Sequence, residues 1–591
     1  MLTPSIIAIL AIIVFLLTAL YLEWFRPTVT FFIAILALVI AGNLTPKEAL
    51  EGFANEQLAV IILLLIISDI FRKSSVIDVI FNKLFGRQEK LSSFKLTMMT
   101  VVAAFSAFFN NTPLVAMMMP YVNKWSKSRK ISPAKLLIPL SYAAILGGCV
   151  TLIGTSTNLI VDGLAVNAGF QPLGIFDFTA VGLPMLVIGI AYIVLFGNKL
   201  LPNNGNKDKT EIQKNREFLV ETKVSPNSLL IGKSIANAGF RNLKGVYIVE
   251  IVRDKHSISP ISPEELIHEN DTLIFAGEIA AVEEITSKNL GLSLPQSVKR
   301  MIEKRKSMNE IVVSFNSSLI GKMVKETDFR ARFDAAIVAI HRNGEKLKGK
   351  IGEIELRAGD VLLVFSGVDF LSRTKNNQAF YVLTHTEKPE DINVVKVYVL
   401  FTALISAVFL SALTSISLLT SLAVVLLIAI FMRIVPLNEI RKGLDFELIL
   451  LIAFGLAFGK AMVNSGASIF LADIFLSLNN ILNPLSYLML IFIVTNVLAA
   501  YITNKAAVAI LFPISVAIAA ELNLNPVPFI LIVSFGAAAN FITPIGYQTN
   551  LMVYGPGGYS FKDYMKIGLP LTLIYMLVSA YILTYIYQIN I

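Results

Sequence analysis

The sequence predicts an α-helical polytopic membrane protein made of two inverted repeats, with two small α+β soluble domains inserted between them. Three observations lead to this prediction. The chain of 591 residues is 55% hydrophobic and only 15% charged, whereas soluble chains carry about 25% charged residues. Apolar sequence fills residues 1–201 and 393–591, and a polar stretch separates these two blocks. Motifs of the first apolar block also recur in the second block.

Each apolar block contains five stretches that approach the roughly 20 apolar residues needed to cross a bilayer. They lie near residues 4–23, 27–43, 57–71, 135–165 and 178–201, and near 393–411, 415–433, 446–463, 527–550 and 568–588. Two further segments, 93–123 and 485–520, are apolar with a polar interruption in the middle.

Flanking charges predict how the two interrupted segments enter the membrane. Lys and Arg are frequent on both sides of 93–123 but absent from 464–484 and 520–527, which flank the second segment. Cytoplasmic loops are enriched in Lys and Arg. We therefore expect two re-entrant hairpins, the first entering from the cytoplasm and the second from outside. The repeats are then inverted, as in many secondary transporters.

Polar motifs recur inside the apolar blocks. GTSTNLIVDG at 154–163 matches GYQTNLMVYG at 546–555, and NNTPLVAMMMP at 110–120 matches TNKAAVAILFP at 503–513. Unwound backbone is tolerated in a membrane where it lines a cavity. We expect a broken helix after each hairpin, with hairpin tips and breaks meeting near the midplane. Freed oxygens there suit a small cation, and helix N-termini suit an anion. The alternative is that these polar residues only pack helices together.

At these motifs the sequence resembles the divalent-anion/sodium symporter family of the ion-transporter superfamily. That family carries a Ser-Asn-Thr signature at each hairpin tip and a Gly-Thr-x-x-Asn type of break. Here the tips read NNT at 110–112 and TNK at 503–505, and the breaks span 154–158 and 543–550. The stretch at 543–568 is especially similar to a branch with a soluble insert, some of whose members transport sulfate.

The resemblance implies sodium-coupled import of a small divalent anion by an elevator-type movement in a homodimer. Sulfate is the first candidate for this anion. The substrate-binding residues it implies are Asn110, Asn111, Thr112, Thr157, Asn158, Thr503, Asn504, Lys505, Thr549 and Asn550. The implied cation-binding residues are Asn111, Thr112, Gly154, Thr155, Asn158, Asn504, Gly546 and Asn550. Of these, Asn111, Thr112, Gly154 and Asn158 form the first sodium site.

Lys505 departs from the family pattern, which has a small neutral residue at this position. An ionisable residue at membrane depth is costly and points to a function. Its ammonium group either replaces the second cation or faces the anion. The alternative is that it reaches the outer surface or pairs with a carboxylate. The hypothesis is that the second sodium site is lost or weakened.

The polar region 202–392 is expected to be cytoplasmic and to contain a second repeat, after a linker at 202–214. SLLIGK at 228–233 returns 89 residues later as SSLIGK at 317–322, and Asp271 returns as Asp360. The runs GVYIVEIVRD and AAIVAIHRNG predict strands, followed by hairpin turns.

Two copies of this pattern, at 215–290 and 304–386, resemble the C-terminal domain of potassium-conductance regulators (the RCK-C or TrkA-C domain). The resemblance implies a regulatory ligand, perhaps a nucleotide, or dimerisation. The alternative is a structural cap without ligand. The Gly-x-Gly-x-x-Gly fingerprint of dinucleotide binding is absent from the sequence.

Several other functions are weighed against sulfate symport. A dicarboxylate or another oxyanion is the main alternative substrate. Proton coupling is disfavoured because all four histidines lie in the polar region. A ligand-gated channel is disfavoured because the Thr-Val-Gly-Tyr-Gly filter is missing. Nothing pairs a nucleophile with a base, so an enzyme is not expected.

The charge and the single cysteine set further limits. The net charge of +9 is explained by basic cytoplasmic loops rather than by a nucleic-acid partner. One cysteine, Cys149, allows no disulfide within the chain and no cysteine-based metal site. We expect the protein to lie in a cell membrane, the inner membrane of a prokaryote.

Overall fold

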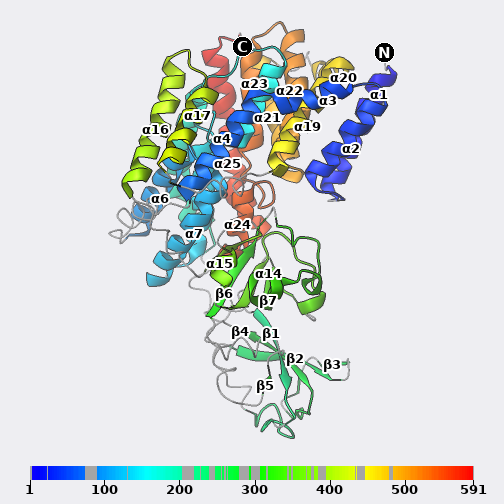
Figure 1. The fold of residues 1–591 in the computed structure, drawn as a ribbon, viewed down its shortest axis with the longest axis vertical. Helices are drawn as coiled ribbons and strands as arrows, with labels where there is room; N and C mark the ends of the chain where they lie inside the picture. The colour runs from blue at the N-terminus through cyan, green and yellow to red at the C-terminus, as the bar shows by residue number, and fades with distance from the viewer. Residues whose placement is uncertain are drawn as a thin grey trace.

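The computed structural model describes residues 3–589 apart from 23, 73–89, 130, 203–217, 227, 239–245, 254–255, 259–260, 263, 278–291, 294–306, 315–316, 343–344, 348–350, 368, 375–378, 384–393, 433, 435–445 and 478–482. The described helices of both apolar blocks form one body, and the strands form two sheets stacked below it (Figure 1). The predicted linker lies outside the described residues from position 203 onward.

The described secondary structure of the first apolar block is helical. Its helices are α1 (Pro4–Tyr21), α2 (Pro27–Ile40), α3 (Pro46–Glu51), α4 (Glu56–Arg72), α6 (Leu91–Ser106), α7 (Asn111–Ser128), α8 (Leu137–Gly148), α9 (Ser156–Asn167) and α10 (Thr179–Leu200).

The second apolar block has a similar make-up. Its helices are α16 (Val394–Leu413), α17 (Leu418–Phe431), α19 (Phe446–Asn464), α20 (Ala467–Leu476), α21 (Pro484–Tyr501), α22 (Asn504–Glu521), α23 (Pro526–Ala538), α24 (Gln548–Gly557) and α25 (Phe561–Ile586).

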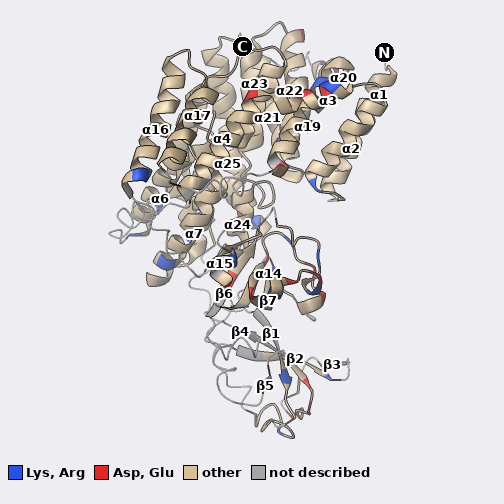
Figure 2. Cartoon of the chain, in the orientation of Figure 1, with Lys and Arg blue, Asp and Glu red and all other residues tan. Residues whose placement is uncertain are grey.

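The predicted polytopic helical membrane protein is confirmed. In the described part of the chain, α1, α10, α21, α22 and α25 are long and apolar enough to cross a membrane, and the number is seven if each of two bent helix pairs counts as one span. Charged residues are sparse in the helical body and gather near helix ends and on the sheets (Figure 2).

Many helices begin at a polar cap followed by proline. Thr3, Thr45, Asn483 and Asn525 each cap a helix whose first residue is proline, and their side chains accept a backbone N–H of the first turn. The cap satisfies one free donor, and proline lacks the donor that would stay unpaired. The sequence therefore fixes where these helices start.

The predicted span at 446–463 turns out to be part of a longer, bent element. After α19 the chain passes Gly466, whose φ is +75°, and enters α20 at a bend of 73°. A glycine adopts this left-handed conformation without the steric cost of a Cβ atom. A second bent pair, at 42°, joins the helical turns at 46–54 to α4.

The two apolar blocks interlock. The first block's α8 packs against α24 of the second block, α9 packs against α22 and α23, and α10 packs against α25. One hydrophobic core therefore runs through both blocks.

Each half of the polar region forms one antiparallel sheet of five strands. The first contains β1 (Phe218–Val224), β2 (Val246–Arg253), β3 (His256–Ile258), β4 (Thr272–Gly277) and β5 (Leu292–Ser293), in the order β3-β2-β4-β1-β5. The second contains β6 (Ser307–Val313), β7 (Ala335–Arg342), β8 (Glu345–Lys346), β9 (Val361–Ser366) and β10 (Phe380–Val382), in the matching order β8-β7-β9-β6-β10. The strands and hairpins predicted in both runs are thus present. The first sheet reaches Ser293, three residues beyond the predicted boundary.

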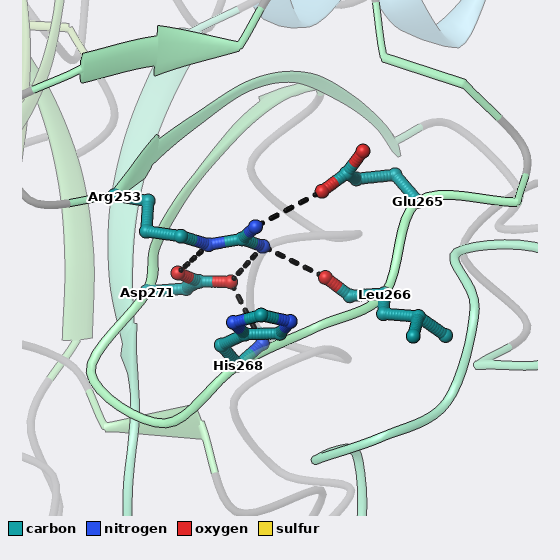
Figure 3. Close-up of polar contacts among 5 residues, drawn as sticks. All are labelled: Arg253, Glu265, Leu266, His268 and Asp271. Carbon is teal, nitrogen blue, oxygen red and sulfur yellow. Dashed lines mark hydrogen bonds and ion pairs between the residues drawn. The ribbon is translucent and has the colours of Figure 1, made fainter.

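Both sheet units contain the same buried ion pair, 89 residues apart. Arg253 holds the buried Asp271 through Nε and Nη2, both at 2.9 Å, and donates to the Leu266 carbonyl at 2.8 Å (Figure 3). Arg342 holds Asp360 in the same way, at 2.7 and 2.8 Å. The hydrogen bond to Asp271 raises the pKa of the Arg253 guanidinium above its usual value. The ion pair therefore connects β2 to the turn before β4 in the first sheet, and β7 to the turn before β9 in the second.

The second sheet unit touches the helical body at α24. A Cβ atom placed on Gly359, just before β9, would lie 3.3 Å from the Leu551 side chain. A Cβ atom on Gly555 would lie 3.2 Å from the Gly359 carbonyl oxygen. Tyr381 and Leu383 also pack against the core of the helical body.

Candidate functional site

The two chain breaks are held by the same hydrogen bonds. Asn158 Nδ2 donates to the carbonyls of Thr151, at 2.8 Å, and Gly148, at 3.4 Å. Asn550 Nδ2 donates to the carbonyls of Thr543, at 3.2 Å, and Asn540, at 2.9 Å. In both breaks the acceptors lie seven and ten residues before the asparagine. These asparagines therefore satisfy carbonyls that the helix ends leave free.

The oxygen of each asparagine is bound by a serine of the other block. Ser534 on α23 donates to Asn158 Oδ1, and Ser141 on α8 donates to Asn550 Oδ1, each at 2.7 Å. Ser141 also lies 2.8 Å from the hydroxyl of Thr549. We call these two serine–asparagine contacts the cross-braces. They occupy polar atoms of Asn158 and Asn550 that we predicted as ligands.

The broken helices α9 and α24 begin next to one another. Their N-cap residues are Thr155 and Tyr547, and the two hydroxyl oxygens lie 3.1 Å apart. Tyr547 also accepts a hydrogen bond of 2.8 Å from Asn111 Nδ2, at the first residue of α7. Either hydroxyl can donate in the contact between Thr155 and Tyr547.

The first hairpin tip contacts the second break at two points. Besides the bond between Asn111 and Tyr547, Thr112 donates to Gln548 Oε1 at 3.0 Å. The N-termini of α7, α9 and α24 therefore converge on one place. Backbone N–H groups and helix dipoles make such a place favourable for an anion.

An oxygen-rich place lies between the first tip and the first break. Ser106 donates to Asn111 Oδ1 and lies 2.7 Å from the Ala144 carbonyl. A Cβ atom on Gly154 would lie within 2.9 Å of the carbonyl oxygens of Ser106 and Gly148. Hard oxygen donors of this kind suit a small alkali cation. Asn111 and Gly154, predicted for the first sodium site, are thus brought together.

The second hairpin tip differs from the first. Thr503 caps α22 by accepting from the Ala506 N–H. Asn504 Oδ1 is buried without a hydrogen-bond donor among the described residues. Lys505 is partly buried. The side chain of Asn540 lies beside Gly546, the predicted backbone ligand. Asn540 Nδ2 donates to the Gly546 carbonyl at 3.3 Å.

Two remaining predicted residues are placed less centrally. Asn110 lines a small cavity formed mainly by apolar side chains such as Phe71, Phe105 and Phe109. Thr157 is buried in the first turn of α9.

Several residues of this arrangement were missed at the level of sequence. They are Ser106, Ser141, Ser534, Asn540, Tyr547 and Gln548. Tyr547 and Gln548 stand inside the repeated motif, where they replace the Thr and Ser of the first copy, and this difference was the available signal. A lone serine in an apolar helix carries no such signal.

Comparison with known proteins identifies the family. A family model described as citrate transporter matches residues 12–494 and 408–590. The chain belongs to this family. The match confirms the resemblance to a transporter family that the motifs indicated, because the family is described as transporters rather than enzymes.

Relatives of known sequence cover nearly the whole chain. An uncharacterized transporter of Synechocystis sp. is 32% identical over 98% of this chain and 97% of its own length. A putative sulfur deprivation response regulator of Chlamydomonas reinhardtii is 31% identical over 93% and 96%. Sodium/sulfate cotransporter 1 of the same alga is 22% identical over 95% and 88%. The resemblance of the sheet units to RCK-C domains stays a prediction.

Proposed function

We propose that this member of the citrate transporter family is a sodium-coupled symporter that imports a small divalent anion, with sulfate as the first candidate. The observation that carries the proposal is the meeting of three helix N-termini, those of α7, α9 and α24, at Asn111, Thr155 and Tyr547. Three positive helix ends in a protein-lined interior favour an anion.

The coupling ion is proposed to bind between the first hairpin tip and the first break. The Asn111 amide and the Gly154 backbone lie there, close to the carbonyls of Ser106 and Gly148. A sodium ion at this place neutralises part of the charge of the anion beside it. It also draws together α7 and the break before α9, which makes anion binding depend on the cation.

The membrane blocks are proposed to be inverted repeats that move as an elevator. The matched hydrogen bonds of Asn158 and Asn550 support the repeat. The orientation of the helical body in the membrane is proposed from three lysines. Lys199 lies in the last turn of α10, and Lys562 and Lys566 lie in the first turns of α25, which packs beside α10. Basic residues at this end favour the cytoplasmic side, so we place the two sheet units, at 202–392, in the cytoplasm.

The choice of anion rests on relatives whose names mention sulfate. Three relatives from Chlamydomonas reinhardtii carry names of sodium/sulfate cotransporters. The second candidate is a carboxylate, because the matching family is described as citrate transporter.

Uptake into proteoliposomes tests the proposal. The purified full chain is reconstituted, and radiolabelled sulfate uptake is followed with an inward sodium gradient or the same gradient of potassium. Excess succinate or citrate is added in parallel, and protein-free liposomes are the control. We expect saturable uptake in sodium only, which neither carboxylate blocks.

Two other outcomes would contradict the proposal. Sodium-driven uptake of succinate or citrate without sulfate uptake would overturn the substrate. Unsaturable anion currents in single-channel records would overturn the transporter class in favour of a channel.

Proton coupling is the second candidate mechanism, and Asp162 on α9 is the observation that favours it. This carboxylate is buried, accepts from the Leu173 N–H at 2.7 Å through Oδ1, and has no donor to Oδ2 among the described residues. Uptake driven by a proton gradient in sodium-free buffer, and lost in Asp162→Asn, would replace sodium with the proton.

A further inference from the structure

Gly148 and Asn540 occupy the same place in the two halves of the site. The Asn158 side chain bonds the Gly148 carbonyl, and the Asn550 side chain bonds the Asn540 carbonyl, each ten residues upstream. The residues after them correspond as well, since Gly154 and Gly546 both lie six positions further on. The two halves can therefore be compared atom by atom around this position.

In the first half, a glycine lets two polar groups approach the backbone closely. A Cβ atom on Gly148 would lie 2.9 Å from both amide atoms of Asn111 and 3.2 Å from the Gly154 carbonyl oxygen. Real Cβ atoms are almost never that close to other heavy atoms. The Asn111 amide and the Gly154 carbonyl can therefore approach residue 148 this closely only because residue 148 has no side chain.

In the second half, an amide stands at the corresponding place. Asn540 is fully buried, and a Cβ atom on Gly546 would overlap its side-chain amide. Asn540 Nδ2 donates to the Gly546 carbonyl, the counterpart of a carbonyl that the first half leaves to a cation. An N–H group and a cation compete for the same lone pairs of that oxygen.

We infer that Asn540 closes the second cation place, so that each transport cycle carries one sodium ion, bound in the first half. This inference rests on the proposed sodium-coupled function and deepens it. Asn540 is a positioning residue, since it holds the second break in the shape that a cation holds in the first.

The second half keeps oxygens that would serve a cation once the place is opened. Asn504 Oδ1 and Asn540 Oδ1 are buried without a donor among the described residues. Lys505 follows Asn504 where the first half has Thr112, and a fixed ammonium repels a second cation. Asn540→Gly and Lys505→Thr both restore a residue of the first half.

Sodium dependence of uptake by the wild-type protein is the primary test. Sulfate uptake is measured over a range of sodium concentrations and at imposed membrane potentials. We expect a Hill coefficient of about one, because it cannot exceed the number of coupled sites. One sodium ion with one sulfate moves one net negative charge inward. An inside-negative potential of 100 mV therefore opposes uptake by about 2.3 kcal/mol.

Variants of Asn540 test which group closes the place. Asn540→Gly, alone and with Lys505→Thr, is expected to raise the Hill coefficient to about two and to remove the effect of membrane potential. Asn540→Asp keeps the side-chain volume but cannot donate to Gly546, and the same shift is expected. The matched control Gly148→Asn fills the first half and should raise the half-saturating sodium concentration at least tenfold.

The outcomes separate this inference from the proposed function. Sodium-driven uptake with a wild-type Hill coefficient of about two and no dependence on potential would overturn the inference and leave the function standing. Absence of sodium-dependent uptake for every anion tested would overturn the proposed function itself. The wild-type measurement decides between these outcomes even where a variant does not fold.

Discussion

The helical body and the sheet units both contain matched contacts, but the contacts connect different things. In the sheet units the Arg253–Asp271 pair and its counterpart Arg342–Asp360 each stay within one copy. In the helical body the two cross-braces each join one block to the other. The matched contacts therefore lie within each of two sheets in one region, and across a single interlocked core in the other. We expect a local defect to remain local in the sheets and to spread in the helical body.

The largest effect is expected from removing one buried ion pair. Arg342→Met leaves the Asp360 carboxylate, which is fully buried, without its partner. This should destabilise the second sheet unit by about 3–5 kcal/mol, since an unpaired buried charge is costly. Hydrogen exchange followed by mass spectrometry should show the largest acceleration of exchange in β6–β10.

Two matched variants check this expectation. Arg253→Met should give the same change confined to the first sheet unit, whereas Arg373→Met removes an exposed pair with Asp369 and should cost less than about 1 kcal/mol. Equal acceleration of exchange in α9 and α24 would show that the sheet units are not independent of the body.

The cross-braces should give a smaller but wider effect. Ser141→Ala or Ser534→Ala leaves a buried asparagine oxygen without its donor, at a cost of about 1–3 kcal/mol. Each single variant should lower the temperature of unfolding and loosen both α9 and α24. A double-mutant cycle should show coupling between the two serines, and strictly additive effects would contradict one shared core.

The contact between α24 and the second sheet unit can be tested with a matched pair of glycines. Gly555→Ala brings a methyl group to 3.2 Å from the Gly359 carbonyl, whereas in Gly163→Ala, the corresponding position of α9, the nearest atom lies at 3.5 Å. Alanine favours a helix over glycine by about 1 kcal/mol. Gly163→Ala should therefore be neutral or stabilising, and Gly555→Ala should lose that gain.

Limited proteolysis reads out this contact. The second sheet unit should be released faster from the Gly555→Ala protein than from the Gly163→Ala protein. Equal rates of release would show that the contact at Gly359 does not hold the unit on α24.

The smallest effect is expected from an exposed contact between the blocks. Lys460 on α19 forms an ion pair of 2.7 Å with Glu51 at the end of α3, and both side chains are partly exposed. Lys460→Met should change stability by less than about 1 kcal/mol, because exposed pairs contribute little. If Lys460→Met lowered the stability as much as Ser534→Ala, burial would not be the reason why the cross-braces stabilise the protein.

The positions of elements and counterparts follow from the sequence. Apolar blocks, breaks at the two polar motifs, caps such as Thr3 and Asn483, and the strands β2 and β7 can all be read from local patterns. These features depend on hydrophobic period and on backbone hydrogen bonding within a few residues. The pairing of Asn111 with Asn504 as counterparts also needs nothing more than alignment of the chain with itself.

The partners of the polar side chains depend on how the blocks pack in space. Alignment shows that Asn158 and Asn550 correspond, but not that each is bound by a serine of the other block, 376 and 409 residues away in the chain. Alignment also shows that Asn540 corresponds to Gly148, but not that the Asn540 amide donates to the Gly546 carbonyl. A buried polar atom must find a partner wherever packing brings one within about 3 Å. Local sequence does not encode that distance, and the distance decides which polar residues form hydrogen bonds across the core.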